Sequence, residues 1–198
     1  MPRLVDHEVR RRQVTDAVRR VICAGGLESV TFQTVAAEAG FSVRLVQYYF
    51  GTKKEFLLAT HRSVMDDAGA RFMKRWSELG TDPTPREALR AVLTELLPLD
   101  EPRREEVLVL GAFGWAAITG QGITAEETFA APRALATLVA DQLIRARRDA
   151  ESRSVAVELD ADLVLMAVGG LAQGMLQGYS TRHSAEQLIE HLLDRVLQ

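Results

Sequence analysis

The sequence predicts an all-α protein with a small three-helix, helix-turn-helix domain at its N-terminus and a larger helical domain after it. Apolar residues recur at the three- and four-residue spacing of helices in successive segments of the 198-residue chain. Breaks rich in glycine and proline separate these segments, and residues 80–85 form the clearest of them. No segment demands a strand, so we expect helices alone.

The first predicted helix is amphipathic. Its apolar residues recur at i, i+3, i+4, i+7 and i+8, namely Val14, Ala17, Val18, Val21 and Ile22. The pair Gly25-Gly26 ends this helix.

The segment from Thr31 to Lys53 has the spacing of a helix-turn-helix. Ala36 lies four positions before Gly40, and Val46 follows six positions after that glycine. Two helices that cross at about 90–120° approach closely, so the first helix needs a residue no larger than alanine at the crossing. The turn needs a residue that tolerates positive φ, and Gly40 does so without steric cost. An ordinary helical corner can share this spacing, which leaves that alternative open for the spacing alone.

Helix-capping side chains agree with this interpretation. Thr31 precedes the first short helix and Ser42 precedes the second, and each offers an oxygen to unpaired N–H groups. Thr52 and Glu55 have the spacing of a capping box, so a third helix is expected to begin just after Gly51.

With its neighbouring residues, this segment resembles the DNA-binding domain of TetR-family transcriptional regulators. The residues that resemble the family are Gly26, Thr31, the run 35–42, Tyr49, Phe50 and the run 53–57. The resemblance covers about residues 8–58. The family usually has tyrosine where this chain has Gln47, and often histidine where it has Tyr48. The family's aromatic phosphate contact is therefore not assigned to Gln47, whose amide suits a base edge or a phosphate.

Seven residues are predicted to bind DNA: Thr31, Gln33, Val43, Arg44, Gln47, Tyr48 and Lys53. Val43 and Arg44 open the recognition helix, where side chains reach base edges. Arg44 is the main specificity candidate, because a guanidinium pairs bidentately with O6 and N7 of guanine. The resemblance implies backbone or base contacts for Thr31, Gln33 and Lys53. Lys53 also lies in the first turn of a helix, where N–H groups and the helix dipole favour a phosphate.

Charge is distributed unevenly along the chain. Residues 1–54 hold nine Lys/Arg and five Asp/Glu, whereas the remaining residues hold fifteen and twenty-two. A basic N-terminal region before an acidic remainder suits a protein of which only the first domain meets phosphates. The arginines at 10–12 and 19–20 could instead solvate a helix face, but beside a helix-turn-helix we favour DNA.

The rest of the chain is predicted to be helical. One long helix runs from Thr52 to about Glu78, and further helices are expected at about 86–97, 103–119, 130–152, 160–179 and 184–197. We place the DNA-binding domain at residues 1–60 and a domain for effector binding and dimerisation at residues 61–198.

The penultimate helix suggests a subunit interface. Residues 163–176 are almost wholly apolar, so this helix must be covered on more than one side. Glycines recur every four residues at 170, 174 and 178, which suggests close backbone packing; an irregular, broken helix is the alternative. The resemblance implies a four-helix homodimer interface, and helices 130–152 and 160–179 are the candidates. The predicted interface residues are Leu135, Leu138, Gln142, Leu163, Gly170, Gly174 and Gly178.

The resemblance also implies a small, mostly apolar effector that alters the spacing of the two DNA-binding domains. Aromatic and methionine side chains of the central helices are its candidate contacts, namely Phe72, Trp76, Phe113, Trp115, Phe129 and Met166. Such residues at helical spacing are more often core than ligand site. The effector's identity does not follow from the sequence.

Nothing in the sequence predicts an enzyme. There is no glycine-rich phosphate loop, GxSxG or HExxH. The four histidines are scattered and Cys23 is the only cysteine, so a structural zinc site is not expected. We therefore expect no catalysis, cofactor or metal.

The chain is expected to be cytoplasmic. No apolar run approaches the roughly 20 residues that span a bilayer, and the first residues are too polar for a signal peptide. A single cysteine excludes an intramolecular disulfide, which suits a reducing compartment.

These observations predict a homodimeric repressor that a ligand releases from a pseudo-palindromic DNA operator. An architectural or protein-controlled DNA-binding factor without an effector is the alternative. A ligand-binding protein whose DNA-binding domain has decayed is a more distant one, suggested only by the departure at Gln47.

Overall fold

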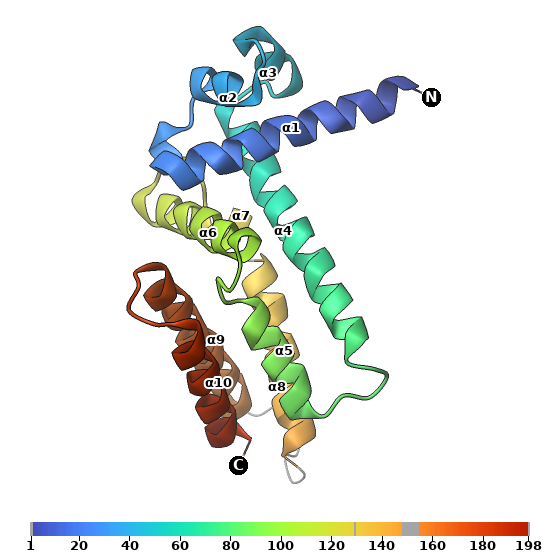
Figure 1. The fold of residues 1–198 in the computed structure, drawn as a ribbon, viewed down its shortest axis with the longest axis vertical. Helices are drawn as coiled ribbons and strands as arrows, with labels where there is room; N and C mark the ends of the chain where they lie inside the picture. Colours follow the sequence, from blue (N-terminus) through green and yellow to red (C-terminus); the bar gives the residue numbers. More distant parts are fainter. Residues whose placement is uncertain (1, 129, 148–154, 198) are drawn as a thin grey trace. The chain divides into compact units, whose positions relative to one another are not determined.

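A computed structural model describes residues 2–128, 130–147 and 155–197 of the chain. Within these ranges every regular element is a helix and no strand occurs, which confirms the predicted fold class. Contacts divide the chain into two compact units (Figure 1). We call Met1–Asp67 with Leu108–Phe129 the head unit, and Ala68–Val107 with Ala130–Gln198 the body unit. The functional division at residue 60 stays a prediction.

The head unit begins with the predicted helix-turn-helix. Its first elements are α1 (Pro2–Gly25), a 3-10 turn (Leu27–Ser29), α2 (Phe32–Ala39), α3 (Val43–Tyr49) and the start of α4 (Lys53–Glu78). Helix α1 contacts both α2 and α3, which lie side by side (Figure 1).

The predicted caps at Thr31 and Ser42 are present, whereas at Thr52 the hydroxyl accepts from the Glu55 N–H (3.2 Å) but the Glu55 carboxylate accepts from the Gly51 N–H (3.1 Å). The Thr31 hydroxyl accepts a hydrogen bond from the Thr34 N–H (3.1 Å), and the Thr34 hydroxyl accepts one from the Thr31 N–H (2.9 Å). Gly40 ends α2 with φ 68°, the left-handed conformation for which glycine was expected. Ser42 caps α3 by accepting from the Leu45 N–H at 3.2 Å.

One apolar core holds the head unit together. It includes residues of α1, α2, α3 and α4, among them Val14, Val18, Val35, Val46, Phe50 and Phe56, all fully buried. Val109, Phe113 and Ala116 of α6 (Glu101–Thr119) belong to the same core. The loop after α6 and the short α7 (Ala125–Thr128) are also attached to the head unit, by a Gln121–Glu28 hydrogen bond (3.1 Å) and a Lys54–Glu127 ion pair (3.0 Å).

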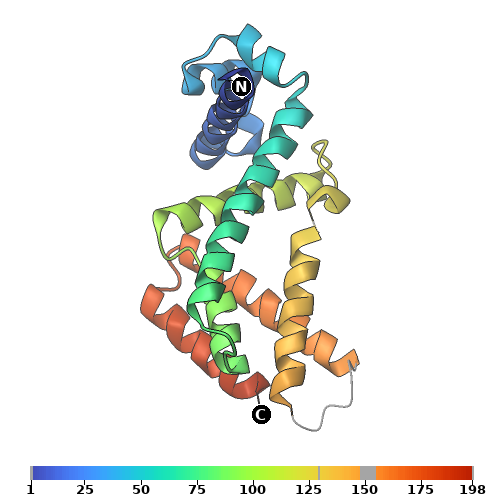
Figure 2. The same cartoon turned by 90° about the vertical axis from the view of Figure 1, so that its right-hand side faces the viewer.

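The body unit is a second helical cluster. Its other helices are α5 (Pro85–Glu95), α8 (Ala130–Ala146), α9 (Val155–Leu176) and α10 (Arg182–Val196). Helices α8 and α10 each contact both α5 and α9 (Figure 2). Capping boxes at Thr84 and Thr181 begin α5 and α10.

The body helices differ from the predicted bounds at several ends, most at α8 and α9. Helix α9 begins at Val155 and ends at Leu176, not at 179, and Gly178 takes φ 75° in the turn that follows. Glycines 170, 174 and 178 therefore do not form one helical stripe. Helix α5 ends at Glu95, two residues before the predicted end. Helix α8 ends at Ala146 and the described Arg147 is not helical, so the helix ends before the predicted residue 152, which itself lies outside the described residues.

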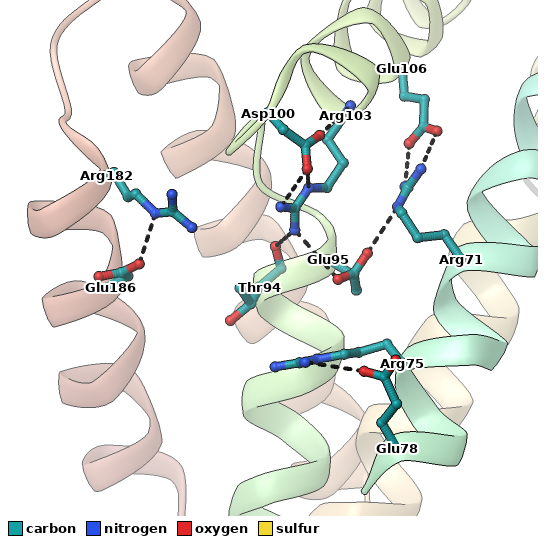
Figure 3. A network of polar contacts seen from close by, with 10 residues as sticks. All are labelled: Arg71, Arg75, Glu78, Thr94, Glu95, Asp100, Arg103, Glu106, Arg182 and Glu186. Carbon is teal, nitrogen blue, oxygen red and sulfur yellow. Dashed lines mark hydrogen bonds and ion pairs between the residues drawn. The ribbon is translucent and has the colours of Figure 1, made fainter.

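A charged network joins α4, α5 and α6 within the body unit (Figure 3). Arg71 donates two hydrogen bonds to the carboxylate of Glu106, at 2.6 and 2.5 Å, and a third to Glu95 at 3.0 Å. Arg103 also pairs with Glu95 and, more closely, with Asp100 at 2.8 Å. The bonds to Glu106, followed by those to Glu95, raise the pKa of Arg71 although burial opposes this. This network ties the body-unit parts of α4 and α6 to α5.

Helix α9 corrects the expectation that no apolar segment approaches membrane-spanning length. By length and composition, Ala156–Leu176 could cross a bilayer, with a mean hydropathy of 1.4. Only 22% of this window is buried. Its exposed residues include Leu159, Leu163 and Met166, which leaves an apolar face of α9 without a partner among the described residues.

Candidate nucleic-acid interface

The recognition helix α3 presents one polar face to solvent. Val46 is fully buried, so the opposite side of this short helix points away from the core. Arg44, Gln47 and Tyr48 are exposed, and their spacing of three and four residues places them together. Tyr48 is 73% exposed. We call these three residues the recognition face.

The other four predicted DNA-binding residues lie around α2, α3 and the start of α4. Val43 packs partly against the head core, which leaves it less available to DNA than Arg44. Gln33 and Lys53 are exposed. Thr31 is exposed as well, but its hydroxyl already serves as the cap of α2. The next residue, Lys54, pairs with Glu127 of α7.

Most of the N-terminal arginines make intramolecular contacts. Arg11 donates to the Tyr49 carbonyl at 2.5 Å, and its guanidinium lies 4.1 Å from the centre of the Phe50 ring. It thereby holds the C-terminal end of the recognition helix against α1. Arg20 pairs with Glu38 of α2 at 2.5 Å. The basic run therefore braces the helix-turn-helix, a role that local sequence reasoning did not assign to it.

Asp67 of α4 binds two further arginines of α1. Arg12 and Arg19 approach its carboxylate to 2.5 and 2.6 Å. Burial alone would raise the pKa of Asp67, but the hydrogen bonds and charges of the two arginines outweigh it and lower that pKa. The carboxylate stays ionised and ties α1 to α4.

An aromatic cluster that the sequence did not reveal borders the recognition face. The His7 ring on α1 lies 4.7 Å from the Tyr49 ring and 6.3 Å from the Tyr48 ring, both edge-on. The two tyrosine rings are 5.3 Å apart. These contacts bridge about forty residues of sequence, so no local pattern could have indicated them.

The predicted effector contacts do not form one cluster among the described residues. Phe113 is buried in the head core, where it meets His61 at 5.1 Å. Phe72 and Trp76 lie 5.7 Å apart and pack against the body core. Trp115 and Met166 are 63% and 72% exposed. Phe129 lies outside the described residues.

The body unit contains an open groove of about 760 Å³ between the end of α4, α5 and α10. Its lining mixes apolar residues such as Leu79 and Ile189 with charged ones such as Arg90 and Glu190, and none of the predicted effector contacts lines it. Within the described ranges, no three His, Cys, Asp or Glu residues gather as a metal site. The groove therefore does not coincide with the predicted effector contacts.

The predicted interface residues fall into two groups. Leu135 and Leu138 pack against the body core, and Gln142 is buried and accepts a hydrogen bond from Arg145 at 2.9 Å. These α8 side chains already have partners within the chain. A Cβ at Gly174 would lie 3.6 Å from Tyr179 of its own turn.

Leu163 and Gly170 form the second group. Leu163 is 63% exposed, and a Cβ at Gly170 would meet nothing within 4 Å. Gly178 lies in the turn after α9 and not in the helix. The predicted interface residues that are exposed or have space around them are therefore Leu163 and Gly170, both on α9 and not on α8.

The fold and the recognition face define a helix-turn-helix DNA-binding protein. A family model described as "Bacterial regulatory proteins, tetR family" matches residues 14–60. The HTH-type transcriptional regulator PksA of Bacillus subtilis is 32% identical over 114 residues, which are 57% of this chain and 54% of PksA. The regulator BetI of Burkholderia mallei is 40% identical over 93 residues, 47% of each chain. The chain thus spans about half the length of the curated relatives it matches.

Solved structures extend the similarity to the whole fold. A transcriptional regulator from Rhodococcus sp. Rha1 has a TM-score of 0.82 and 29% identity, covering 95% of this chain and 96% of that one. A regulator from Saccharomonospora viridis, solved in complex with choline, has a TM-score of 0.76 and 22% identity, with 94% of each chain covered. Residues 14–60 thus form a TetR-family DNA-binding domain, and the whole chain has the fold of these solved regulators. These relatives are regulators, which confirms the expectation that the chain is not an enzyme.

Proposed function

We propose that this protein is a sequence-specific transcriptional repressor that binds a pseudo-palindromic operator as a homodimer. The observation that supports this most is the recognition face, on which Arg44, Gln47 and Tyr48 are exposed together on a helix braced by α1. Arg44 would read guanine in the major groove. Lys53 and Gln33 would bind the DNA backbone and position the helix. Residues 1–60 would form the DNA-binding domain.

The homodimer would form through α9 and α10. Leu159, Leu163 and Met166 of α9 and Leu188 of α10 are each more than half exposed, a set that we call the α9–α10 face. A soluble helix that is apolar on its exposed side needs a cover, and a second copy of the same face supplies one with two-fold symmetry. Leu163 and Gly170 remain in this proposal, whereas Leu135, Leu138 and Gln142 support the body core.

A dimer would double the DNA contact. Two-fold related recognition helices reach successive major grooves only when they are about 34–36 Å apart or a multiple of this distance. An operator with two symmetric half-sites follows from that geometry. The protein would act in the cytoplasm, where its DNA target lies.

A small, mostly apolar effector would release the operator. Two structural neighbours support a small-molecule ligand: the Saccharomonospora viridis regulator was solved with choline, and the multidrug binding protein EbrR with imidazole. The effector must bind more tightly to the conformation in which the two recognition helices do not match the operator spacing than to the one in which they do. The coupling free energy between effector and operator is typically about 1–3 kcal/mol. Residues 61–198 would contain both its site and the dimer surface.

Selection of bound sequences from a random duplex library tests this function. The purified protein is incubated with the library at about 150 mM salt, and bound duplexes are amplified and sequenced. We expect a two-fold symmetric motif. Weak binding that disappears as salt rises, without a motif, would contradict a sequence-specific regulator.

A further inference from the structure

His7 lies on the head unit and is not among the DNA-contacting residues proposed above. It lies on α1, is exposed, and contacts the rings of Tyr48 and Tyr49 on the recognition helix. Its neighbour one turn along α1, Arg11, is occupied by the Tyr49 carbonyl. His7 is therefore a polar ring that α1 presents beside α3.

The contact with Tyr48 places His7 at the edge of the recognition face. Tyr48 is 73% exposed and follows Arg44 by one helical turn, so both side chains leave α3 on the same side. When α3 lies in a major groove, the rim of this face meets the sugar–phosphate backbone that borders the groove. His7 is within reach of that rim, since its ring centre is 6.3 Å from that of Tyr48.

The chemistry of imidazole suits a phosphate at this position. A neutral histidine donates one hydrogen bond, and a protonated histidine donates two and adds a positive charge. Histidine gains this charge between about pH 8 and pH 5. A charge-assisted bond to phosphate is shorter and stronger than a neutral one.

We propose that His7 is a further DNA-contacting residue that binds a backbone phosphate at the edge of the recognition face, and that this contact strengthens when its ring is protonated. The inference rests on the proposed DNA binding. A protonated ring adds a positive charge to the phosphate contact, so affinity is expected to be higher at pH 6 than at pH 8. Tyr48 and Tyr49 are the titratable groups that contact His7 from α3, and Glu8, Arg10 and Arg11 are its nearby charged groups on α1.

The test measures DNA affinity at about pH 6 and pH 8, across a series of salt concentrations, for three proteins. The wild type is compared with His7→Gln, which keeps a donor without charge, and with His7→Phe, which keeps the aromatic packing without a donor. A phosphate contact does not depend on sequence, so a random-sequence duplex is used alongside the selected operator.

Between pH 8 and pH 6, we expect the affinity of the wild type to rise about fivefold more than that of His7→Gln. At the lower pH, the salt slope of the wild type should be steeper than that of His7→Gln by about one. His7→Phe should lose the same pH dependence while keeping the wild-type melting temperature. His183→Gln, in the body unit, should behave as the wild type. If His7→Phe matches the wild type in affinity and salt slope at both pH values, His7 only packs against Tyr49 and the proposal is wrong.

The random duplex also separates this inference from the proposed function. A wild type that selects no operator contradicts sequence-specific regulation, yet its binding to the random duplex still shows whether His7 contributes a protonated contact. A wild type that selects an operator without any dependence on His7 contradicts the inference alone.

Discussion

Arg44 is the residue on which sequence recognition is expected to depend most. It is exposed on α3, and the neighbouring Val43 is partly buried, so Arg44 is the first side chain of the helix that is free to enter the groove. Arg44→Ala should weaken binding to the selected operator by about 1–3 kcal/mol and relax specificity at one base pair. Fluorescence anisotropy with the operator and its single-base variants measures both effects.

Arg104→Ala is the matched control for this change, because Arg104 is an exposed arginine of α6 in the body unit. It should leave operator binding unchanged. A uniform loss over all base variants in Arg44→Ala would instead assign Arg44 to a phosphate.

His61 makes the stability of the head unit depend on pH. Burial, followed by the charge of Arg62, lowers the pKa of His61, which packs against Phe113. An unfolded histidine takes up a proton near pH 6.5, so below this pH the unfolded state gains a proton that the folded state resists. Stability should therefore fall between pH 7.5 and 5.5. Thermal unfolding of wild type and His61→Gln measures this, and an equal pH dependence in both would contradict it.

Some residue roles could be predicted from the sequence, because they depend on near neighbours. The caps at Thr31 and Ser42 and the left-handed Gly40 are of this kind. The bracing role of Arg11 was missed, because its partner Tyr49 is 38 residues away and only the folded chain brings them together.

Among the elements, α4 and α6 depend on a buried ion pair in the body unit. The Glu106 side chain is only 8% exposed and receives two hydrogen bonds from Arg71. Glu106→Ala leaves the part-buried guanidinium of Arg71 with Glu95 alone, which should cost about 1–3 kcal/mol. Urea unfolding should show this loss, with the exposed Glu101→Ala on the same helix as its control. A change below about 0.5 kcal/mol would contradict the role of this pair.

The α9–α10 face predicts how the subunits associate. Leu163→Glu places a charge in the centre of a symmetric interface, once in each copy, and should weaken the dimer by about 2 kcal/mol or more, at least thirtyfold. Sedimentation velocity over a range of concentrations measures this change. Ile118→Glu is the control, because Ile118 is 79% exposed but lies on α6. Dissociation by the control and not by Leu163→Glu would place the interface elsewhere.

The elements show where sequence patterns were insufficient. The long apolar run of α9 correctly indicated a helix, and its cover by a second subunit stays a prediction. The partner face of α9 stays a prediction, because Leu135 and Leu138 of α8 have the same apolar pattern whether they pack against their own core, as they partly do, or meet a second subunit. The end of α9 was misplaced because Gly178 fits both a helical stripe and a terminating turn, and its φ of 75° decides for the turn.

At the scale of the whole molecule, regulation requires that the body unit influence the head unit. Helices α4 and α6 each contribute residues to both units. Under the proposed function, a change at the effector site would reach the DNA-binding residues through these continuous helices. The fold class was predictable from the pattern of apolar residues. The effector site was not, because aromatic residues at helical spacing fill a core as readily as they line a pocket.

The central claim is that two recognition helices of one symmetric dimer read two half-sites together. The most direct measurement compares the affinity of the wild-type protein for the selected operator with that for the same operator carrying five extra base pairs between the half-sites. The insertion turns one half-site by about half a helical turn, out of reach of the second head. The account predicts that affinity falls toward the non-specific level, about a thousandfold or more. Equal affinity for both duplexes would show that each head binds DNA independently, and would contradict the account.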